Sequence, residues 1–236
     1  MISIIIPLYN EEDNVILLAG ELKAIQVQVK DQKTEVLFID DGSTDQTWKH
    51  IKTCMQKYKF VRGIQSAKNR GQSAAMLLGL SNAQGTMIVL MDGDLQNDPQ
   101  DIPKLIMQLN ACDVVCGYRS KRRDTWSRRI ASRLANRIRN WVTQDGIRDT
   151  GCSLKIFKAS CAQDIPPLDG VHRFLPAYFK LHGRTIQEMP VNHRPRKHGV
   201  SKYTNVQRLP KTLLDLFGFW WYRKRYLEEP SPTSKV

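Results

Sequence analysis

Three short apolar runs in the amino-terminal half of the chain each end in acidic or amide side chains that favour turns. The runs lead into Tyr9-Asn10-Glu11, into Asp40-Asp41-Gly42-Ser43 and into Asp92-Gly93-Asp94. Apolar runs bounded by turn residues are typical of strands that are buried on both faces of a parallel sheet. Because parallel strands end at the same edge of a sheet, the sequence predicts that these polar side chains meet there.

Strand-like and helix-like stretches alternate along the chain. This alternation implies right-handed crossovers, and the predicted fold class is α/β, with a Rossmann-like, mostly parallel sheet flanked by helices. A basic helix near 126–143 and a strand near 185–191 are expected farther along. In the amino-terminal half, strands are expected near 2–6, 35–39, 60–65, 86–91 and 113–117, and helices near 12–28, 45–58, 72–83 and 101–110.

The tripeptide Asp92-Gly93-Asp94 has two interpretations. Taken alone, it is typical of a turn, because Gly supplies a positive φ and Asp bonds its own backbone. Two carboxylates at a strand end can also hold a divalent cation, and the cation can hold a diphosphate. The other acidic strand ends favour this metal site. The usual glycine-rich phosphate-binding motifs of dinucleotide-binding proteins and P-loop proteins are absent from the sequence.

Charge is divided unevenly along the chain. The first 117 residues have a net charge of −3 and the remainder +16, which gives the total of +13. The basic part is therefore expected to contact an anion, and the candidates are a lipid phosphate, a bilayer surface or nucleic acid. A nucleic-acid-binding protein is disfavoured, because the amino-terminal part is acidic and the sequence has no recognised nucleic-acid motif.

Six motifs in a fixed order resemble those of a known enzyme family. The chain is similar to the family 2 glycosyltransferases with the GT-A fold, and within them to the polyprenyl-phosphate glycosyltransferases, the group that includes dolichyl-phosphate mannose synthase. The resemblance covers residues 1–205, which it implies are the catalytic domain. Its motifs are Pro7-Leu8-Tyr9-Asn10-Glu11, Asp40-Asp41-Gly42-Ser43, Asn69-Arg70-Gly71, Asp92-Gly93-Asp94-Leu95-Gln96, Asp149-Thr150-Gly151-Cys152 and Arg196-Lys197-His198-Gly199-Val200-Ser201-Lys202.

The resemblance implies a binding site for a nucleotide-diphosphate sugar and a divalent metal, Mg²⁺ or Mn²⁺. Simple packing at a strand end is the other interpretation of Pro7 and Ile39. The implied nucleotide-sugar ligands are Pro7, Tyr9, Glu11, Asp41, Asp92 and Ser201, with a backbone contact from Ile39. The implied metal ligands are Asp92, Asp94 and Gln96, and the implied catalytic residues are Asp92, Asp94, Arg196 and Lys202.

The resemblance also implies an acceptor site. Arg119, Arg128 and Ser132 match the residues that hold an acceptor phosphate in the family, although the loop between the two arginines is short for the family. Arg196, Ser201 and Lys202 would belong to a mobile loop that closes over the donor diphosphate, or to a disordered basic segment. Asp149 would either position the basic groups or bound phosphate of the site, or cap a turn.

The carboxyl-terminal segment departs from the family pattern. Many relatives continue into transmembrane helices, whereas no apolar run here approaches the length of a spanning helix. Residues 206–226 combine Trp, Phe and Tyr with Arg223, Lys224 and Arg225, which predicts an amphipathic helix at an anionic membrane surface. The alternative is a helix that packs on the catalytic domain or at a dimer contact. Residues 227–236 are expected to be disordered.

The predicted activity is inverting transfer of a sugar from a UDP- or GDP-linked donor to a polyprenyl phosphate, undecaprenyl or dolichyl, for cell-envelope glycan or lipid A-type modification. The alternative is a family 2 enzyme that acts on a saccharide hydroxyl during polysaccharide synthesis, which requires a carboxylate base. Five cysteines without a Cys-x-x-Cys pair suggest a reducing compartment. The protein is therefore expected on the cytoplasmic face of the membrane, peripherally bound, with a homo-oligomer possible and nucleic acid not expected as a partner.

Overall fold

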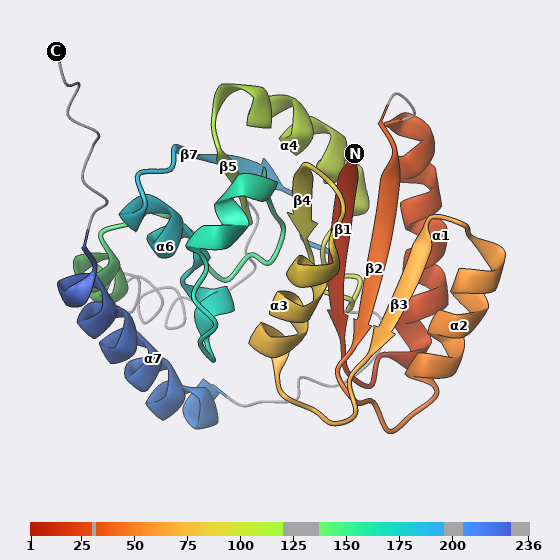
Figure 1. Cartoon of the computed structure of the whole chain (residues 1–236), viewed down its shortest axis with the longest axis horizontal. Helices are drawn as coiled ribbons and strands as arrows, with labels where there is room; N and C mark the ends of the chain where they lie inside the picture. The colour runs from red at the N-terminus through yellow and green to blue at the C-terminus, as the bar shows by residue number, and fades with distance from the viewer. Residues whose placement is uncertain (30–31, 120–136, 196–204, 228–236) are drawn as a thin grey trace, which may run out of the picture.

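The computed structural model describes residues 1–29, 32–119, 137–195 and 205–227. Within these residues seven strands form one sheet, which Figure 1 shows with helices on both faces. The strands are β1 Ile2–Leu8, β2 Thr34–Asp40, β3 Val61–Gln65, β4 Met87–Leu90, β5 Val114–Arg119, β6 Lys155–Lys158 and β7 Ile186–Val191. Their order in the sheet is β3-β2-β1-β4-β6-β5-β7.

Parallel pairing dominates the sheet, as predicted. β1 pairs in parallel with β2 and β4, β2 pairs in parallel with β3, and β5 pairs in parallel with β7. β6 is the exception, because it runs antiparallel to both β4 and β5. The first residue of β6, Lys155, is therefore level with Leu90 at the end of β4.

Helices occupy the crossovers between the strands. The bounds of the α-helices are α1 Glu12–Gln28, α2 Thr47–Lys57, α3 Gln72–Asn82, α4 Ile102–Gln108, α6 Leu175–Leu181 and α7 Asn205–Arg225. Residues 137–143 are also helical. The short 3₁₀ turns are η1 Pro99–Asp101, η2 Leu109–Ala111, η3 Ala159–Asp164 and η4 Val171–Arg173.

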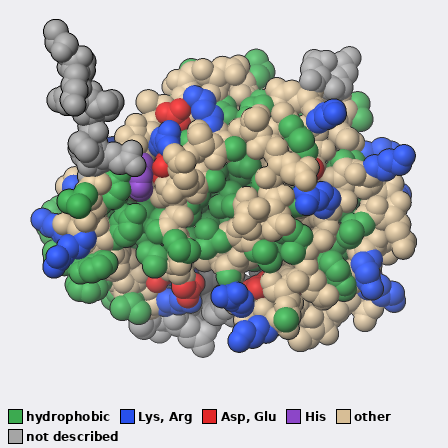
Figure 2. Space-filling model, viewed as in Figure 1, with side chains coloured by type: hydrophobic (Ala, Val, Ile, Leu, Met, Phe, Trp, Pro, Cys, Tyr) green, Lys and Arg blue, Asp and Glu red, His purple; other side chains and the backbone are tan. Residues whose placement is uncertain are grey.

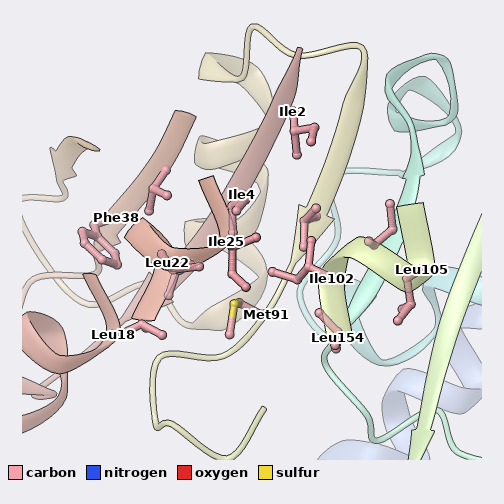
Figure 3. Packing of buried hydrophobic residues seen from close by; sticks show 14 of the residues in the cluster. Ile2, Ile4, Leu18, Leu22, Ile25, Phe38, Met91, Ile102, Leu105 and Leu154 are labelled. Carbon is pink, nitrogen blue, oxygen red and sulfur yellow. The ribbon is translucent and has the colours of Figure 1, made fainter. Parts of the chain in front are cut away.

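Alternate residues of the central strands enter two separate cores. Ile4 and Ile6 of β1 belong to a cluster with α1, α2 and α4, whereas Ile5 belongs to a second cluster with α3 and α6. Figure 3 shows the first cluster, in which Leu18 and Leu22 of α1 pack beside the sheet. Burial on both faces explains why these strands are continuous apolar runs rather than alternating ones.

One side of α7 packs on the second core. Phe219 is only 1% exposed and lies against the rings of Phe174 and Tyr178, at centroid distances of 5.9 and 5.0 Å. Nearer the start of the helix, Asp215 Oδ2 accepts a hydrogen bond of 2.5 Å from Arg173 Nη1. Among the described residues, no helix is both long and apolar enough to cross a membrane.

The predicted strands and helices of the amino-terminal half are confirmed within a few residues. Two elements were not predicted, namely the strand β6 and the helix α6. The carboxyl-terminal segment is helical, as expected, and part of it packs on the protein. Most of the predicted basic helix and the whole predicted tail beyond residue 227 lie outside the described residues.

Candidate functional site

The loops that follow β1 and β2 are joined by hydrogen bonds. Asn10 N donates to Ser43 Oγ (2.9 Å), and Thr44 N donates to Asn10 Oδ1 (2.8 Å). Glu11 N donates to Thr47 Oγ1 (2.8 Å). Asn10 has a φ of 50°, a left-handed conformation that Asn adopts more readily than most residues. The chain that leaves β1 is therefore fixed beside the end of β2.

Asp41 joins β2 to the loop before α3. Its carboxylate accepts hydrogen bonds from Arg70 N (3.0 Å) and Gly71 N (2.7 Å). Burial raises the pKa of Asp41, and these two backbone donors oppose that shift. The motifs Asp40-Asp41-Gly42-Ser43 and Asn69-Arg70-Gly71 thus meet at one edge of the sheet, although they are far apart in the sequence.

The residues predicted to bind the nucleoside lie at this edge in different environments. Pro7 lines the cavity described below. Tyr9 and Glu11 are partly buried just beyond β1. The side chain of Ile39 is fully buried, so that only its backbone can contact a ligand.

Asp92 and Asp94 lie directly beyond β4. Asp92 Oδ1 accepts a hydrogen bond from Gln72 Nε2 (2.8 Å), and Asp94 Oδ1 accepts one from Gln96 N (3.1 Å). Burial and the neighbouring carboxylate of Asp94 raise the pKa of Asp92 to about 6. Gly93 between them packs so closely that an added Cβ would lie 2.2 Å from Leu8 Cδ2. Asp94 thus bonds its own backbone, as the turn interpretation expected, but Gly93 does not have the positive φ that this interpretation gave it.

Arg119 at the end of β5 is held by Asp149. Arg119 Nε donates to Asp149 Oδ2 and Arg119 Nη2 donates to Asp149 Oδ1, both at 2.7 Å. This two-point contact fixes the plane of the guanidinium group. The role predicted for Asp149, to position a basic group, agrees with this geometry.

A polar bridge connects the acidic and basic parts of the site. Ser153 Oγ lies 2.8 Å from Asn97 Oδ1 and is also placed to donate to Asp92, where its hydrogen bond opposes the rise in the pKa of that carboxyl. Since a hydroxyl has one hydrogen, it donates to one of the two at a time. Lys155, which is 2% exposed, donates through its ammonium group to the carbonyl oxygens of Cys152 and Thr150.

These groups surround a cavity of about 630 Å³. One wall comes from the edge of the sheet, and the opposite wall comes from η4, α6 and α7. Polar and charged residues of the lining include Asp92, Asp94, Gln96, Arg119, Lys155, His172, Arg173 and His193. Apolar residues of the lining include Met76, Leu90, Ile138, Phe174, Leu175, Leu213 and Leu216. The lining therefore offers both charged groups and apolar surface to a ligand.

His172 in the cavity wall forms a hydrogen bond with Ser73 of α3. Its Nδ1 lies 2.7 Å from Ser73 Oγ. Burial and the neighbouring Arg173 lower the pKa of His172 to about 3, so the ring is neutral near pH 7.

The carboxylate pair fits a divalent cation. Among the described residues, no group of three or more His, Cys, Asp or Glu side chains is arranged to hold a metal ion. Mg²⁺ is commonly bound by one or two carboxylates together with substrate phosphates, so Asp92 and Asp94 would suffice beside a diphosphate. The pKa of Asp92 is raised first by burial and then by the neighbouring carboxylate of Asp94, and a bound cation would offset the second effect.

Several predicted site residues lie outside the described part of the chain. These are Arg128, Ser132, Arg196, Ser201 and Lys202. The structure does describe the residues that directly precede Arg196. Arg194 N donates to Gln96 O (2.8 Å), and His193 forms an isolated bridge with Asn97. The predicted basic loop therefore begins beside the carboxylate pair.

Residues of the site that sequence reasoning missed include Gln72, Ser153, Lys155 and His172. Gln72 follows the Asn69-Arg70-Gly71 motif directly, so its position in the chain could have indicated it. Ser153 and Lys155 follow Asp149-Thr150-Gly151-Cys152 in the same way. His172 has no comparable signal, because it comes from a turn that the pattern did not predict.

Comparison with protein families gives a match to glycosyl transferase family 2 over residues 3–165. The chain is 36% identical over 235 residues to dodecaprenyl-phosphate galacturonate synthase of Rhizobium johnstonii, covering 97% of this chain and 69% of that protein. It is 32% identical over 218 residues to undecaprenyl-phosphate 4-deoxy-4-formamido-L-arabinose transferase of Edwardsiella ictaluri, covering 91% of this chain and 66% of that protein. The chain thus spans about two thirds of the length of these relatives.

Solved structures share the architecture. Glucosyl-3-phosphoglycerate synthase of Mycobacterium tuberculosis with Mn²⁺, uridine diphosphate and phosphoglyceric acid has a TM-score of 0.72 at 16% identity, covering 97% of this chain and 80% of that one. The same enzyme with Mg²⁺ and uridine diphosphate has a TM-score of 0.71 at 16% identity, covering 94% and 79%. At these identities the likeness shows the fold, which is the GT-A arrangement predicted from the sequence.

Proposed function

Because the chain belongs to glycosyl transferase family 2, we propose that it transfers a sugar from a nucleotide-diphosphate sugar to a polyprenyl phosphate, with inversion at the anomeric carbon. One observation carries the proposal: a single cavity joins the carboxylates beyond β4 to Arg119 and to an apolar wall. Carboxylates suit a metal-bound diphosphate, a guanidinium group suits a phosphate, and an apolar wall suits an isoprenoid chain. The names of the R. johnstonii and E. ictaluri relatives support the same class of acceptor.

The donor would bind along the ends of β1, β2 and β4. A bound Mg²⁺ or Mn²⁺ would supply positive charge where the nucleoside diphosphate leaves. The solved relatives that contain uridine diphosphate with either ion support this choice. The residues proposed to hold the ion are Asp92, Asp94 and Gln96, and those proposed to contact the nucleoside are Pro7, Tyr9, Glu11, Asp41 and the backbone of Ile39.

The acceptor phosphate would bind on the other side of the cavity, at Arg119. A phosphate is already anionic at neutral pH, so it can attack the anomeric carbon without a general base. The bond from that carbon to the donor diphosphate breaks as the bond to the acceptor oxygen forms. Arg128 and Ser132 are proposed to hold the same phosphate, and Arg196, Ser201 and Lys202 to close over the donor diphosphate.

The lipid chain would leave the cavity toward a membrane. Leu213 and Leu216 of α7 and Ile138 line the apolar side of the cavity. Beside Leu213, the outer face of α7 carries an exposed stripe, which we call the α7 apolar stripe and which consists of Leu214, Phe217, Trp220 and Trp221. Figure 2 shows hydrophobic side chains along α7 and Lys or Arg side chains beside its carboxyl-terminal end.

We therefore propose that α7 lies in the interface of an anionic membrane. Aromatic residues and neighbouring cations are the combination that favours the boundary between acyl chains and headgroups. All five cysteines are free and buried, which agrees with a reducing compartment and with the cytoplasmic face of the membrane.

A transfer assay with the purified chain tests the function. Labelled UDP- and GDP-sugars are supplied with Mg²⁺ or Mn²⁺ and with a polyprenyl phosphate in mixed micelles, and radioactivity is measured in the organic extract. We expect lipid-bound label with the polyprenyl phosphate and none with the corresponding polyprenol, which lacks the attacking phosphate. Label transferred instead to a saccharide acceptor would contradict the proposal and favour a polysaccharide-synthesising enzyme.

A further inference from the structure

Lys155 is a buried cation at the floor of the cavity. It begins β6, where it is level with Leu90 of β4 and Cys116 of β5. The residue is 2% exposed, and its ammonium group donates to the carbonyl oxygens of Cys152 and Thr150, the second at 3.4 Å. Both of these acceptors are uncharged. Burial of an ammonium group is unfavourable, and a hydrophobic residue of similar volume would avoid this cost.

The two carbonyl groups belong to a loop that contacts both sides of the site. This loop, residues 149–153, carries Asp149 at one end and Ser153 at the other. Asp149 holds the guanidinium group of Arg119 at two points. Ser153 reaches the carboxylate of Asp92 and the amide of Asn97. Lys155 therefore lies at the junction between the groups on the acceptor side and those on the donor side.

We propose that Lys155 is a positioning residue for sugar transfer. Its ammonium group holds the 149–153 loop in place and so sets Arg119 relative to Asp92. Its charge, which acts on the carboxylate of Asp92, also favours the anionic groups of the substrates at this end of the cavity. The proposal rests on the proposed function and adds a residue that lies outside the six sequence motifs.

Replacement by methionine tests this role. Lys155→Met keeps an unbranched side chain and removes both the donors and the charge. We expect kcat/KM for the polyprenyl phosphate to fall roughly 10–100-fold. This is the range for residues that orient the groups in direct contact with a ligand. Binding of the free nucleotide without metal should stay the same, because the proposed nucleoside contacts lie at the ends of β1 and β2. Lys155→Arg, which keeps the charge and the donors, should restore most of the loss.

Lys158→Met is the matched control. Lys158 lies at the other end of β6, where its ammonium group is 2.9 Å from Asp113 Oδ1 and its side chain is 46% exposed. This variant should transfer sugar like the wild type. A double-mutant cycle of Lys155→Met with Asp149→Asn should be non-additive, because both changes release the same loop.

Each result is decisive. Wild-type kinetics in Lys155→Met would overturn the positioning role. A loss of metal-free nucleotide binding and of thermal stability that accompanies the loss of transfer would also overturn it. If Lys155→Met does not fold, Lys155→Gln is measured in the same way, and wild-type kcat/KM in that variant also overturns it. Failure of the wild type to glycosylate polyprenyl phosphate would instead refute the proposed function.

Discussion

Asp94 combines a carboxylate at the proposed metal site with a hydrogen bond that shapes the chain. It is 9% exposed and accepts from the backbone of Gln96. Asn has nearly the same shape and keeps an oxygen acceptor, but it lacks the negative charge. Replacement by Asn therefore separates the two roles.

Asp94→Asn should lower transfer by at least about 100-fold, because a neutral amide is a weak ligand for a hard cation. The free energy of unfolding without ligand should change by less than about 1 kcal/mol, since the hydrogen bond to Gln96 is kept. Mn²⁺ binding and transfer rates are measured together. Asp113→Asn, at the opposite edge of the sheet, is the control and should keep transfer. Full activity of Asp94→Asn, or of the wild type in excess EDTA, would refute metal dependence.

His172 makes the stability of the fold depend on pH. Its pKa is about 3 in the folded protein and about 6.5 in an unfolded chain, so the unfolded state binds the proton more tightly. The stability that the neutral ring contributes is full above pH 6.5 and is lost as the pH falls toward 3.

When the pH is lowered from 7 to 5, we expect protonation of His172 to decrease the free energy of unfolding of the wild type by about 1–2 kcal/mol. His172→Gln should show a smaller decrease over the same interval, because Gln does not titrate. Urea unfolding at the two pH values measures both decreases. Equal decreases in the two proteins would show that His172 is not responsible.

The part of the site that lies next to strand ends could be predicted from the sequence. Asp92 and Asp94 follow an apolar run directly, and their place at the sheet edge follows from the direction of the strands. Gln72 and Lys155 lie just beyond motifs, so the sequence could have indicated them as neighbours of the site, but not which groups they contact. His172 could not be predicted, because it reaches the cavity through packing between elements that are distant in the sequence.

At the scale of elements, β6 shows where periodicity fails. The strand has four residues, with a lysine at each end and only Ile156 and Phe157 between them. Such a segment has too little pattern to predict a strand. Its conformation depends on pairing with both β4 and β5, which supplies hydrogen bonds on both sides. The longer strand β1, by contrast, contains a run of three isoleucines, and β2 contains Val36-Leu37-Phe38-Ile39, so an apolar run marks each of them in the sequence.

The helix α7 has two faces with different tasks. Phe219 faces the core, whereas Phe217 on the outer face is 61% exposed. The alternatives considered for this segment, packing on the protein and docking on a membrane, are therefore compatible within one helix. Because each face carries a phenylalanine, the same substitution can be made at Phe219 and at Phe217 and the effects compared.

Phe219→Ala should lower the free energy of unfolding by about 3–5 kcal/mol, since it leaves a cavity in the core. Phe217→Ala should change it by less than about 0.5 kcal/mol. Phe217→Ala should instead weaken binding to anionic vesicles, measured by flotation, because it removes part of the α7 apolar stripe. If Phe217→Ala binds vesicles like the wild type, this stripe is not the membrane contact.

At the scale of the whole molecule, the acidic and the basic parts of the chain both contribute charged residues to the cavity. The acidic amino-terminal part contributes Asp92 and Asp94, and the basic remainder contributes Arg119, Arg173 and the cationic end of α7. Electrostatic attraction to an anionic leaflet would thus act on the part of the molecule that carries the acceptor side of the cavity.

Lys224→Gln with Arg225→Gln should weaken binding to anionic vesicles by about 1 kcal/mol for each charge removed. Added salt should reduce wild-type binding, since exposed charges are screened. Lys52→Gln with Lys57→Gln on α2 removes the same charge elsewhere and is the control. An equal effect of the two double variants would indicate a general charge effect rather than a docking face.

The antiparallel strand β6 also acts as a spacer. Neighbouring strands lie about 4.8 Å apart, so one strand between β4 and β5 separates these two by about 10 Å. Asp92 follows the first of them and Arg119 ends the second. That width can accommodate a single sugar ring with a phosphate on either side, whereas directly paired strands would bring the two groups too close together. In the proposed reaction, the distance between donor and acceptor groups would thus be set by the backbone of the sheet as well as by the side chains that border the cavity.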